Sequence, residues 1–279
     1  MHFHPLDTSP PVLSAEQLGF AYPGGGEVFS GLSLTVRRGE FLALVGPSGC
    51  GKTTLLNLLS GFLKPSTGSV RVDGVEVFPE LPALGYVFQT PNLFPWLTVL
   101  ANVRFGLRMA GTMPAARQRQ RAMEYLALVG LADVADFLPH QLSGGMRQRV
   151  ALARALVLEP RILLMDEPFA ALDAISRLSM QEELLRIWRA LGQAIIFITH
   201  DLDEAVFLAD RVLVLGAAPQ GICGAFDIDL PRPRDGLVTR RSEHFAAYRA
   251  QISDRIAALT GSSRAISSTP ARMFAHVTI

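Results

Sequence analysis

The sequence is poor in the features that mark several large protein classes. Two cysteines in 279 residues, Cys50 and Cys223, do not suffice for a disulfide scaffold and indicate a reducing compartment. No apolar run approaches the roughly 20 residues that cross a bilayer as a helix. Residues 1–11 carry neither a basic nor an apolar signal segment, so we expect no signal peptide. Work at a membrane would therefore need another chain to cross it.

Net charge and lysine are also scarce. The formal net charge is +1, which gives no indication of a nucleic-acid partner or an acidic substrate. Lysine occurs only at positions 52 and 64, so nearly all of the 26 basic residues are arginine. A coding bias toward arginine explains this scarcity. The two lysines still stand out, because arginine does not replace lysine where a compact ammonium is needed.

Hydrophobic residues are plentiful, at 49% of the chain, and they are arranged as alternating strands and helices. Apolar runs typical of buried strands are separated by helical patterns, which predicts an α/β fold with a mostly parallel sheet. Residues 91–141 break this alternation with a helical, arginine-rich pattern. The predicted strands are 40–45, 68–77, 84–88, 161–165, 194–198 and 212–215, and the predicted helices are 53–62, 150–158, 176–191 and 204–208.

The C-terminal part has a different pattern. We expect residues 226–260 to form an extension with one helix, capped by Ser242, running to Leu259 and stopping at Gly261. Residues 261–279 are small, polar and without periodicity, which predicts a disordered tail.

Residues 46–53 read Gly-Pro-Ser-Gly-Cys-Gly-Lys-Thr and lie between a predicted strand and a predicted helix. They fit the phosphate-binding pattern G-x-x-x-x-G-K-[ST] in the context that the pattern requires. Its glycines turn backbone N–H groups toward phosphates, and the helix N-terminus adds partial positive charge. Lys52 can reach the β- and γ-phosphates, and Thr53 can bind Mg²⁺. A chance match has odds of about one in a hundred, and an ordinary glycine turn would not explain the lysine.

Asp166 and Glu167 follow the apolar run 161–165. They therefore lie at the carboxyl end of a predicted strand, where α/β sheets bind their ligands. Asp166 can hold Mg²⁺ through water, and Glu167 can accept a proton from an attacking water. An Asp-Glu pair alone is more often a solvated turn. Because this pair follows a buried strand and the chain also has a phosphate loop, we favour a catalytic role for it.

Residues 142–149 read Leu-Ser-Gly-Gly-Met-Arg-Gln-Arg. Ser143 is a candidate N-cap, and Gly144 and Gly145 leave backbone N–H groups open, which makes a second anion site. Two phosphate-binding helix starts in one chain favour a head-to-tail dimer, in which each ATP lies between the phosphate loop of one copy and the Ser143 segment of the other. The alternative is a plain N-cap with a flexible turn.

With these segments in their order and spacing, the chain resembles the ABC-type ATPases from about residue 13 to 215. The resemblance implies a P-loop NTPase core with a mostly parallel sheet, an antiparallel β subdomain and an inserted α-helical subdomain. The nucleotide-binding domain would span residues 12–225, with the insertion at about 91–160. The segments resemble Walker A (46–53), the Q-loop (Gln89), the signature (142–145), Walker B (162–167), the D-loop (171–173) and the switch histidine (His200).

The resemblance also implies roles for single residues, with ATP and Mg²⁺ as cofactors. Glu167, His200 and Gln89 would be catalytic, and Thr53, Gln89 and Asp166 would hold Mg²⁺. Asp173 would bridge two copies. For Gln89, His200 and Tyr22 the alternatives are a polar turn residue, a strand-end histidine and a packed turn residue. The implied nucleotide contacts are Tyr22, Gly46, Pro47, Ser48, Gly49, Cys50, Gly51, Lys52, Thr53, Thr54, Ser143, Gly144, Gly145 and Asp173.

Four segments further resemble the nitrate/sulfonate/taurine importer group, whose motor subunits are very similar to those of thiamine-precursor pyrimidine importers. Residues 216–224 are less typical. The resemblance implies an ATP-hydrolysing motor subunit on the cytoplasmic face of the plasma membrane. Its partners would be a second copy, an integral permease and, indirectly, an extracytoplasmic solute-binding protein, with no nucleic acid. The alternatives are a soluble ABC ATPase acting on a macromolecule such as DNA, disfavoured by the neutral charge, and a non-catalytic scaffold. The segments are 93–103, 139–149, 166–169 and 230–234.

Two residues carry expectations of their own. Trp96 belongs to the apolar segment 93–96 shortly after Gln89; exposed, it would suit a permease helix, and otherwise it would be buried in the helical insertion. Cys50 lies near a helix N-terminus, where thiolates are favoured. We therefore expect thiol reagents to inactivate the protein and ATP to protect it, unless Cys50 is only a small residue that fits the loop.

Overall fold

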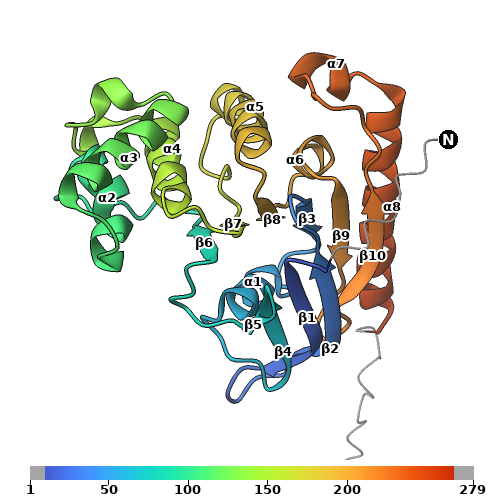
Figure 1. The fold of residues 1–279 in the computed structure, drawn as a ribbon. Helices are drawn as coiled ribbons and strands as arrows, with labels where there is room; N and C mark the ends of the chain where they lie inside the picture. The colour runs from blue at the N-terminus through green and yellow to red at the C-terminus, as the bar shows by residue number, and fades with distance from the viewer. Residues whose placement is uncertain (1–9, 267–279) are drawn as a thin grey trace, which may run out of the picture.

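The computed structural model describes residues 10–266, and Figure 1 shows that they form two β-sheets with helices. Five strands of the larger sheet are parallel, and β10 pairs antiparallel with β9 at one edge. This confirms the predicted α/β class. The strand order is β10-β9-β3-β8-β7-β6, with β3 at Phe41–Val45, β6 at Leu84–Val87, β7 at Ile162–Asp166, β8 at Ala194–Ile198, β9 at Arg211–Leu215 and β10 at Ile222–Asp227.

The smaller sheet is antiparallel and has the order β2-β1-β4-β5. The prediction of one strand over residues 68–77 is wrong, because Asp73 and Gly74 both have positive φ and turn the chain between two strands. The strands are β1 (Leu13–Ala21), β2 (Glu27–Val36), β4 (Thr67–Val72) and β5 (Val75–Glu76).

The larger sheet is the middle layer of the molecule. All residues of β3 are buried, as expected for a parallel strand covered on both faces. Leu42 and Leu44 pack toward helix α1 (Lys52–Ser60) and the antiparallel sheet. Phe41, Ala43 and Val45 pack toward the other helices. The alternation of strand side chains thus divides the core into two clusters.

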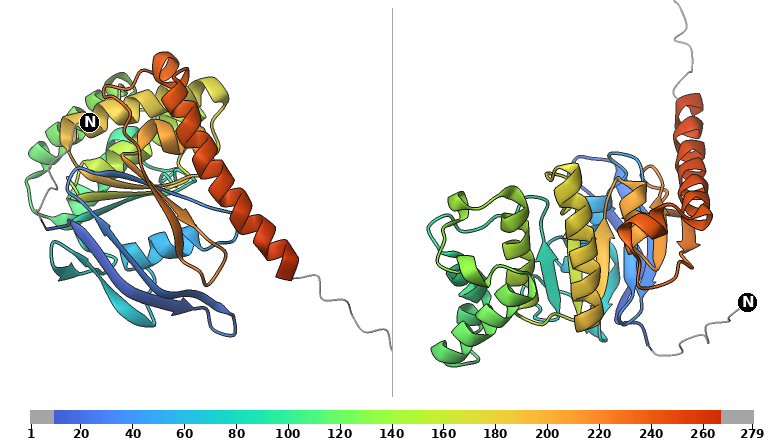
Figure 2. Two further views of the ribbon diagram at one scale, coloured as in Figure 1. Left: turned by 90° about the vertical axis from the view of Figure 1, so that its right-hand side faces the viewer. Right: turned by 90° about the horizontal axis from the view of Figure 1, so that it is seen from above.

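The remaining helices fall into groups at the sheet. Helices α2 (Val99–Ala110), α3 (Ala115–Leu128) and α4 (Gly144–Leu156) lie together on the β6 side, and the C-terminal helix lies on the β10 side (Figure 2). Helices α5 (Ala174–Leu191) and α6 (Leu202–Leu208) lie between them. Two 3-10 turns complete the elements, η1 (Ala132–Val134) and η2 (Pro139–Gln141).

The C-terminal extension differs from the prediction of one helix. It holds two, α7 (Gly236–Arg240) and α8 (Glu243–Ile266). Ser242 caps α8 as predicted, since its Oγ accepts from the Phe245 N–H at 3.2 Å. However, α8 runs through Gly261, because an interior glycine costs a helix only about 1 kcal/mol. Residues 267–279 of the predicted disordered tail lie outside the described residues.

Within residues 10–266, no helix has both the length and the apolar character that a membrane span requires.

Candidate active site

The phosphate loop connects the end of β3 to the start of α1. Gly51 is the N-cap of α1 and has φ +96°. A Cβ atom there would lie 2.8 Å from the Phe29 ring and 2.9 Å from Val28 Cγ1, so only glycine fits. No side chain caps the helix, and its first turn has no acidic residue. The first N–H groups of α1 are therefore left for an anion.

Lys52 is held across this loop. Its Nζ donates to the carbonyl oxygens of Gly46 (3.0 Å) and Pro47 (2.9 Å), and the residue is only 9% exposed. A cavity of about 340 Å³ opens beside it. Glu167 reaches this cavity from β7, so the structure brings the predicted base to the phosphate loop. The lining residues are Ser48, Gly49, Gly51, Lys52, Thr53, Thr54 and Glu167.

Thr53 and Asp166 meet at the candidate Mg²⁺ position. The Thr53 hydroxyl donates to Asp166 Oδ1 at 3.4 Å. Burial raises the pKa of Asp166, against the lowering effect of the Thr53 hydrogen bond. No group of three or more His, Cys, Asp or Glu among the described residues could hold a metal ion. The hard oxygen donors of Thr53 and Asp166 fit Mg²⁺, which takes its other ligands from phosphates and water.

Glu167 and His200 form the second pair. His200 Nδ1 lies 3.1 Å from Glu167 Oε2. The pair forms because β7 and β8 are neighbours, and the Glu167 N–H donates to the Ile198 carbonyl at 3.0 Å. Glu167 has φ +43°, in the left-handed region. Such strain in a residue other than glycine costs about 1–3 kcal/mol and is concentrated at functional sites. The geometry orients the carboxylate of a candidate general base.

Tyr22 and Gln89 are the two remaining predicted site residues in the N-terminal half of the chain. The Tyr22 hydroxyl is 3.1 Å from Thr54 Oγ1, and its ring packs edge-on against Phe20. Tyr22 is 45% exposed, so its side chain is accessible to a flat ligand beside the phosphate loop. Gln89 is exposed just after β6, the neighbour of β7, so it lies at the same edge of the sheet as Asp166.

Ser143 and Asp173 are helix caps in this structure. Ser143 Oγ accepts from the Met146 N–H at 3.3 Å and starts α4, as predicted. Asp173 accepts from the N–H groups of Ile175 (3.1 Å) and Ser176 (3.0 Å) at the start of α5. The hydrogen bonds from Ser176 hold the pKa of Asp173 below its usual value. The structure does not bring Ser143, Gly144 or Gly145 into the cavity beside Lys52.

The structure does not favour the thiolate expected at Cys50, and the predicted inactivation by thiol reagents stays a prediction. Cys50 is 2% exposed and its side chain belongs to the apolar cluster beneath the loop. Burial raises the pKa of the thiol, despite Lys52 Nζ at 3.9 Å from Sγ. The alternative interpretation, a small residue that fits the loop, agrees with this geometry.

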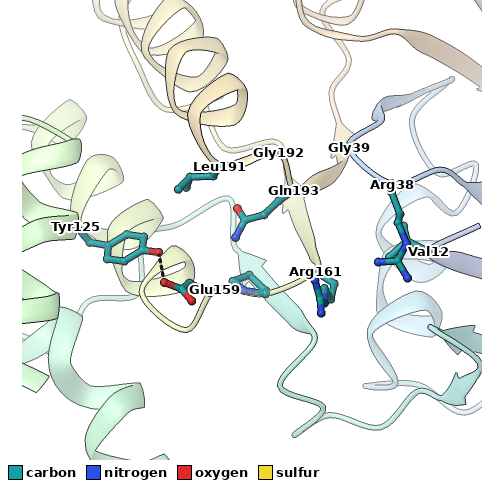
Figure 3. Close-up of a pocket in the computed structure, with 10 residues that line it drawn as sticks. Val12, Arg38, Gly39, Tyr125, Glu159, Arg161, Leu191, Gly192 and Gln193 are labelled. Carbon is teal, nitrogen blue, oxygen red and sulfur yellow. Dashed lines mark hydrogen bonds between the residues drawn. The ribbon is translucent and has the colours of Figure 1, made fainter. Parts of the chain in front are cut away.

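A second cleft, of about 520 Å³, lies away from these residues (Figure 3). Arg38, Arg161 and Gln193 in its wall precede β3, β7 and β8, so the cleft is at the amino ends of the parallel strands. The phosphate loop, Asp166 and His200 are at the carboxyl ends. The cleft contains no predicted site residue and is not part of the nucleotide site. Its other lining residues are Val12, Gly39, Tyr125, Glu159, Pro160, Leu191 and Gly192.

Sequence reasoning missed the support behind His200. The Thr199 hydroxyl donates to Glu204 Oε2 at 2.6 Å and accepts from the Asp201 N–H at 3.0 Å. Asp201 caps α6 by accepting from the N–H groups of Asp203 and Glu204. The one available signal was Asp201, a residue type that favours the N-cap, before a helical run.

Comparison with known proteins places these observations in a family. The model of the ABC transporter family matches residues 29–170. The aliphatic sulfonates import ATP-binding protein SsuB 1 of Xanthomonas axonopodis is 47% identical over 236 residues, covering 85% of this chain and 92% of that protein. The taurine import ATP-binding protein TauB of Yersinia pestis is 51% identical over 188 residues, 67% of this chain and 73% of that one.

Solved structures agree with this family assignment. The ATP-binding cassette MJ0796, determined as a dimer in a post-hydrolysis state with ADP and phosphate, has a TM-score of 0.68 and 31% identity. The match covers 78% of this chain and all of that one.

Proposed function

The chain belongs to the ABC transporter family and is an ATP-binding ATPase, and on that premise we propose that it is the motor subunit of an importer for a small solute. The observation that carries the proposal is the Glu167–His200 pair beside Lys52 at the phosphate loop. The names of the sulfonate and taurine relatives support import through a separate membrane permease. The solute would belong to the nitrate, sulfonate or taurine class or a related one.

Two groups of residues would take part in hydrolysis, one that holds Mg²⁺ and one that acts on the attacking water. Thr53, Asp166 and Gln89 would hold Mg²⁺, whose charge stabilises phosphate oxygens during transfer. Glu167 accepts a proton from the attacking water, and His200 keeps the carboxylate oriented and contacts the γ-phosphate. The 3.1 Å contact between these side chains supports that assignment.

The site is completed by a second copy of the chain in a head-to-tail dimer. Ser143 and Gly144 are exposed and do not line the phosphate cavity of their own chain. The open N–H groups at the start of α4 therefore suit the nucleotide of a partner copy. The dimeric state of MJ0796 supports this arrangement. Asp173, exposed at the start of α5, would bridge the copies.

The permease would dock at the segment 93–96. Trp96 is 73% exposed, so its burial in the helical region is excluded. The Phe94 ring contacts it, with ring centroids 5.8 Å apart, and also packs on Phe105 at 4.5 Å. An exposed indole suits an apolar helix of a partner. The chain would then lie peripherally on the cytoplasmic face of the plasma membrane, with an extracytoplasmic solute-binding protein as an indirect partner.

The decisive test compares wild type with Glu167→Gln, using ATP hydrolysis and light scattering. We expect the wild type to hydrolyse ATP, and the variant to lose hydrolysis but form an ATP-dependent dimer. Glu80→Gln, at an exposed position away from the cavity, is the control and should behave as wild type. Equal hydrolysis by wild type and Glu167→Gln, both remaining monomeric with ATP, would refute the proposed base and dimer.

A further inference from the structure

Helix α6 begins immediately after His200 and Asp201 and ends against the C-terminal extension. We call residues 228–240 the C-terminal strap; they follow β10 and end with helix α7. Helices α7 and α8 pack against α6 (Figure 1). Helix α6 is seven residues long and its residues 204–208 are buried, so core packing and the polar groups at its two ends together determine its position.

The strap binds the C-terminal end of α6 with two arginines. The last carbonyl groups of a helix lack partners within that helix. Arg234 Nη1 donates to the carbonyl oxygens of Val206 (3.3 Å), Phe207 (3.0 Å) and Ala209 (2.7 Å). Arg232 Nη2 donates to the one between them, Leu208, at 2.8 Å. Four successive carbonyls at the end of α6 are thus bound by the strap.

The Arg234 side chain is buried where it binds the carbonyl groups of α6. It is 7% exposed, and its other hydrogen bond goes to the Ile228 carbonyl at 3.2 Å. All four hydrogen bonds that its guanidinium makes within residues 10–266 thus go to carbonyl oxygens. Burial, with Arg232 nearby, lowers the pKa of Arg234 to about 10, so it keeps its charge at neutral pH. The negative end of the α6 dipole favours a cation at this point.

Arg232 extends the connection to the sheet. It bonds Asp210 through Nε (3.0 Å) and Nη2 (2.7 Å), and its guanidinium stacks on Trp188 at 4.3 Å. The other oxygen of Asp210 accepts from the N–H of Phe41, the first residue of β3. The strap thereby ties α6 to the strand that leads into the phosphate loop.

The N-terminal end of α6 transmits this position to His200. Glu204 of α6 accepts from Thr199, the residue before His200. It also accepts from Gln181 of α5 at 3.1 Å. Arg240, where the strap ends, donates to Gln181 and stacks on Phe207 of α6 at 4.2 Å. Strap and network together leave α6 little freedom to shift relative to β8.

We propose that the C-terminal strap positions the catalytic pair, with Arg232 and Arg234 acting through α6 on His200. They are positioning residues: they bind neither nucleotide nor Mg²⁺. The inference rests on the proposed role of His200 in hydrolysis. It assigns the extension a part in the turnover step and not in ATP binding.

The test measures kcat and KM for ATP in the purified full chain with Arg232→Ala or Arg234→Ala. Displacing a catalytic group by a fraction of an ångström should lower kcat about tenfold. KM should stay within about twofold, because no group that binds ATP is removed. Millimolar guanidinium should restore part of the lost kcat in Arg234→Ala by occupying the emptied site. Arg255→Ala is the matched control: Arg255 is an exposed arginine of α8 that bonds the Cys223 carbonyl, and its loss should change neither constant.

The variant His200→Ala distinguishes a failure of the proposed role of His200 in hydrolysis from a failure of the strap inference. If it retains full activity, the proposed role of His200 fails; if it is inactive while both strap variants keep wild-type kcat, only the strap inference fails. A fall in kcat with a lower melting temperature and no response to guanidinium would overturn the inference, because the strap would then be merely structural. Should Arg234→Ala not fold, Arg232→Ala, at a side chain 22% exposed, decides by kcat and KM alone.

Discussion

Asp166, the proposed Mg²⁺ ligand, is a residue whose charge destabilises the free protein. Its carboxylate is partly buried and accepts a hydrogen bond from Thr53, and burial raises its pKa. A raised pKa means that the folded chain favours the protonated form, so this group supports folding at acid pH. That contribution is lost as pH rises through the folded-state pKa. The free protein is thus destabilised by a charge that Mg²⁺ would neutralise.

We predict that Asp166→Asn raises the melting temperature of the nucleotide-free protein at neutral pH. The gain should shrink as pH falls through the raised pKa, since wild-type Asp166 is then also neutral. The same variant should lose the additional stabilisation that Mg²⁺ gives with ATP, weakening metal-dependent binding at least about tenfold. Thermal unfolding from neutral to acid pH, with ATP and with or without Mg²⁺, measures both. A lower melting temperature of the free variant at neutral pH would contradict the account.

At the residue scale, the sequence predicted which candidate site residues lie close together, but not the direction of every side chain. Lys52 and Asp166 were predictable because a strand end and a helix start bring them together whatever surrounds them. The burial of the Cys50 side chain was not predicted, because its direction depends on long-range packing beneath the loop. The contact of Thr199 with Glu204 gave no short-range signal either, since it depends on how α6 leaves β8.

At the scale of elements, strong periodicity predicted the five parallel strands and helices α1, α4, α5 and α6, whereas β10 was not predicted. Errors arose where a glycine lies within or beside a periodic segment. Helix α8 continues through Gly261, whereas Asp73 and Gly74 divide a predicted strand into two. A glycine ends a helix or strand only where the chain has to turn. The strap was predicted only as part of a C-terminal extension with one helix. Its arginines act on carbonyls of α6 some 25 residues earlier, which no local pattern reveals.

The segment 93–96 carries a prediction at this scale. Trp96→Ala should lower ATP-driven transport in the assembled importer, because the exposed indole is removed from the proposed docking surface. ATPase activity of the isolated chain should not change, since Trp96 is remote from the phosphate cavity. Met109→Ala removes another exposed apolar side chain, 61% exposed on α2, and serves as control. Transport and basal ATPase are measured side by side; unchanged transport in Trp96→Ala would exclude docking at this residue.

In the proposed head-to-tail dimer, the whole molecule supplies two half-sites, one at the phosphate loop and one at the start of α4. A chain with Lys52→Ala loses the first half and a chain with Ser143→Arg loses the second. In a head-to-tail dimer of either variant alone, both composite sites contain one defective half. A mixed dimer differs, because one of its two sites combines the phosphate loop of the Ser143→Arg chain with Ser143 of the Lys52→Ala chain, and both of these halves are intact.

Mixing two inactive variants should therefore restore hydrolysis. With random pairing half of the dimers are mixed, and each has one intact site of two, so about a quarter of wild-type activity is expected if the sites act independently. ATP-dependent dimers should return together with it in light scattering. The control mixes Lys52→Ala with Glu167→Gln, which damages the same half of the site. That mixture should stay inactive, because Glu167 belongs to the same cavity as Lys52 and every composite site then contains a defective half. Recovery in both mixtures, or in neither, would contradict a site shared between a phosphate loop and a partner's Ser143.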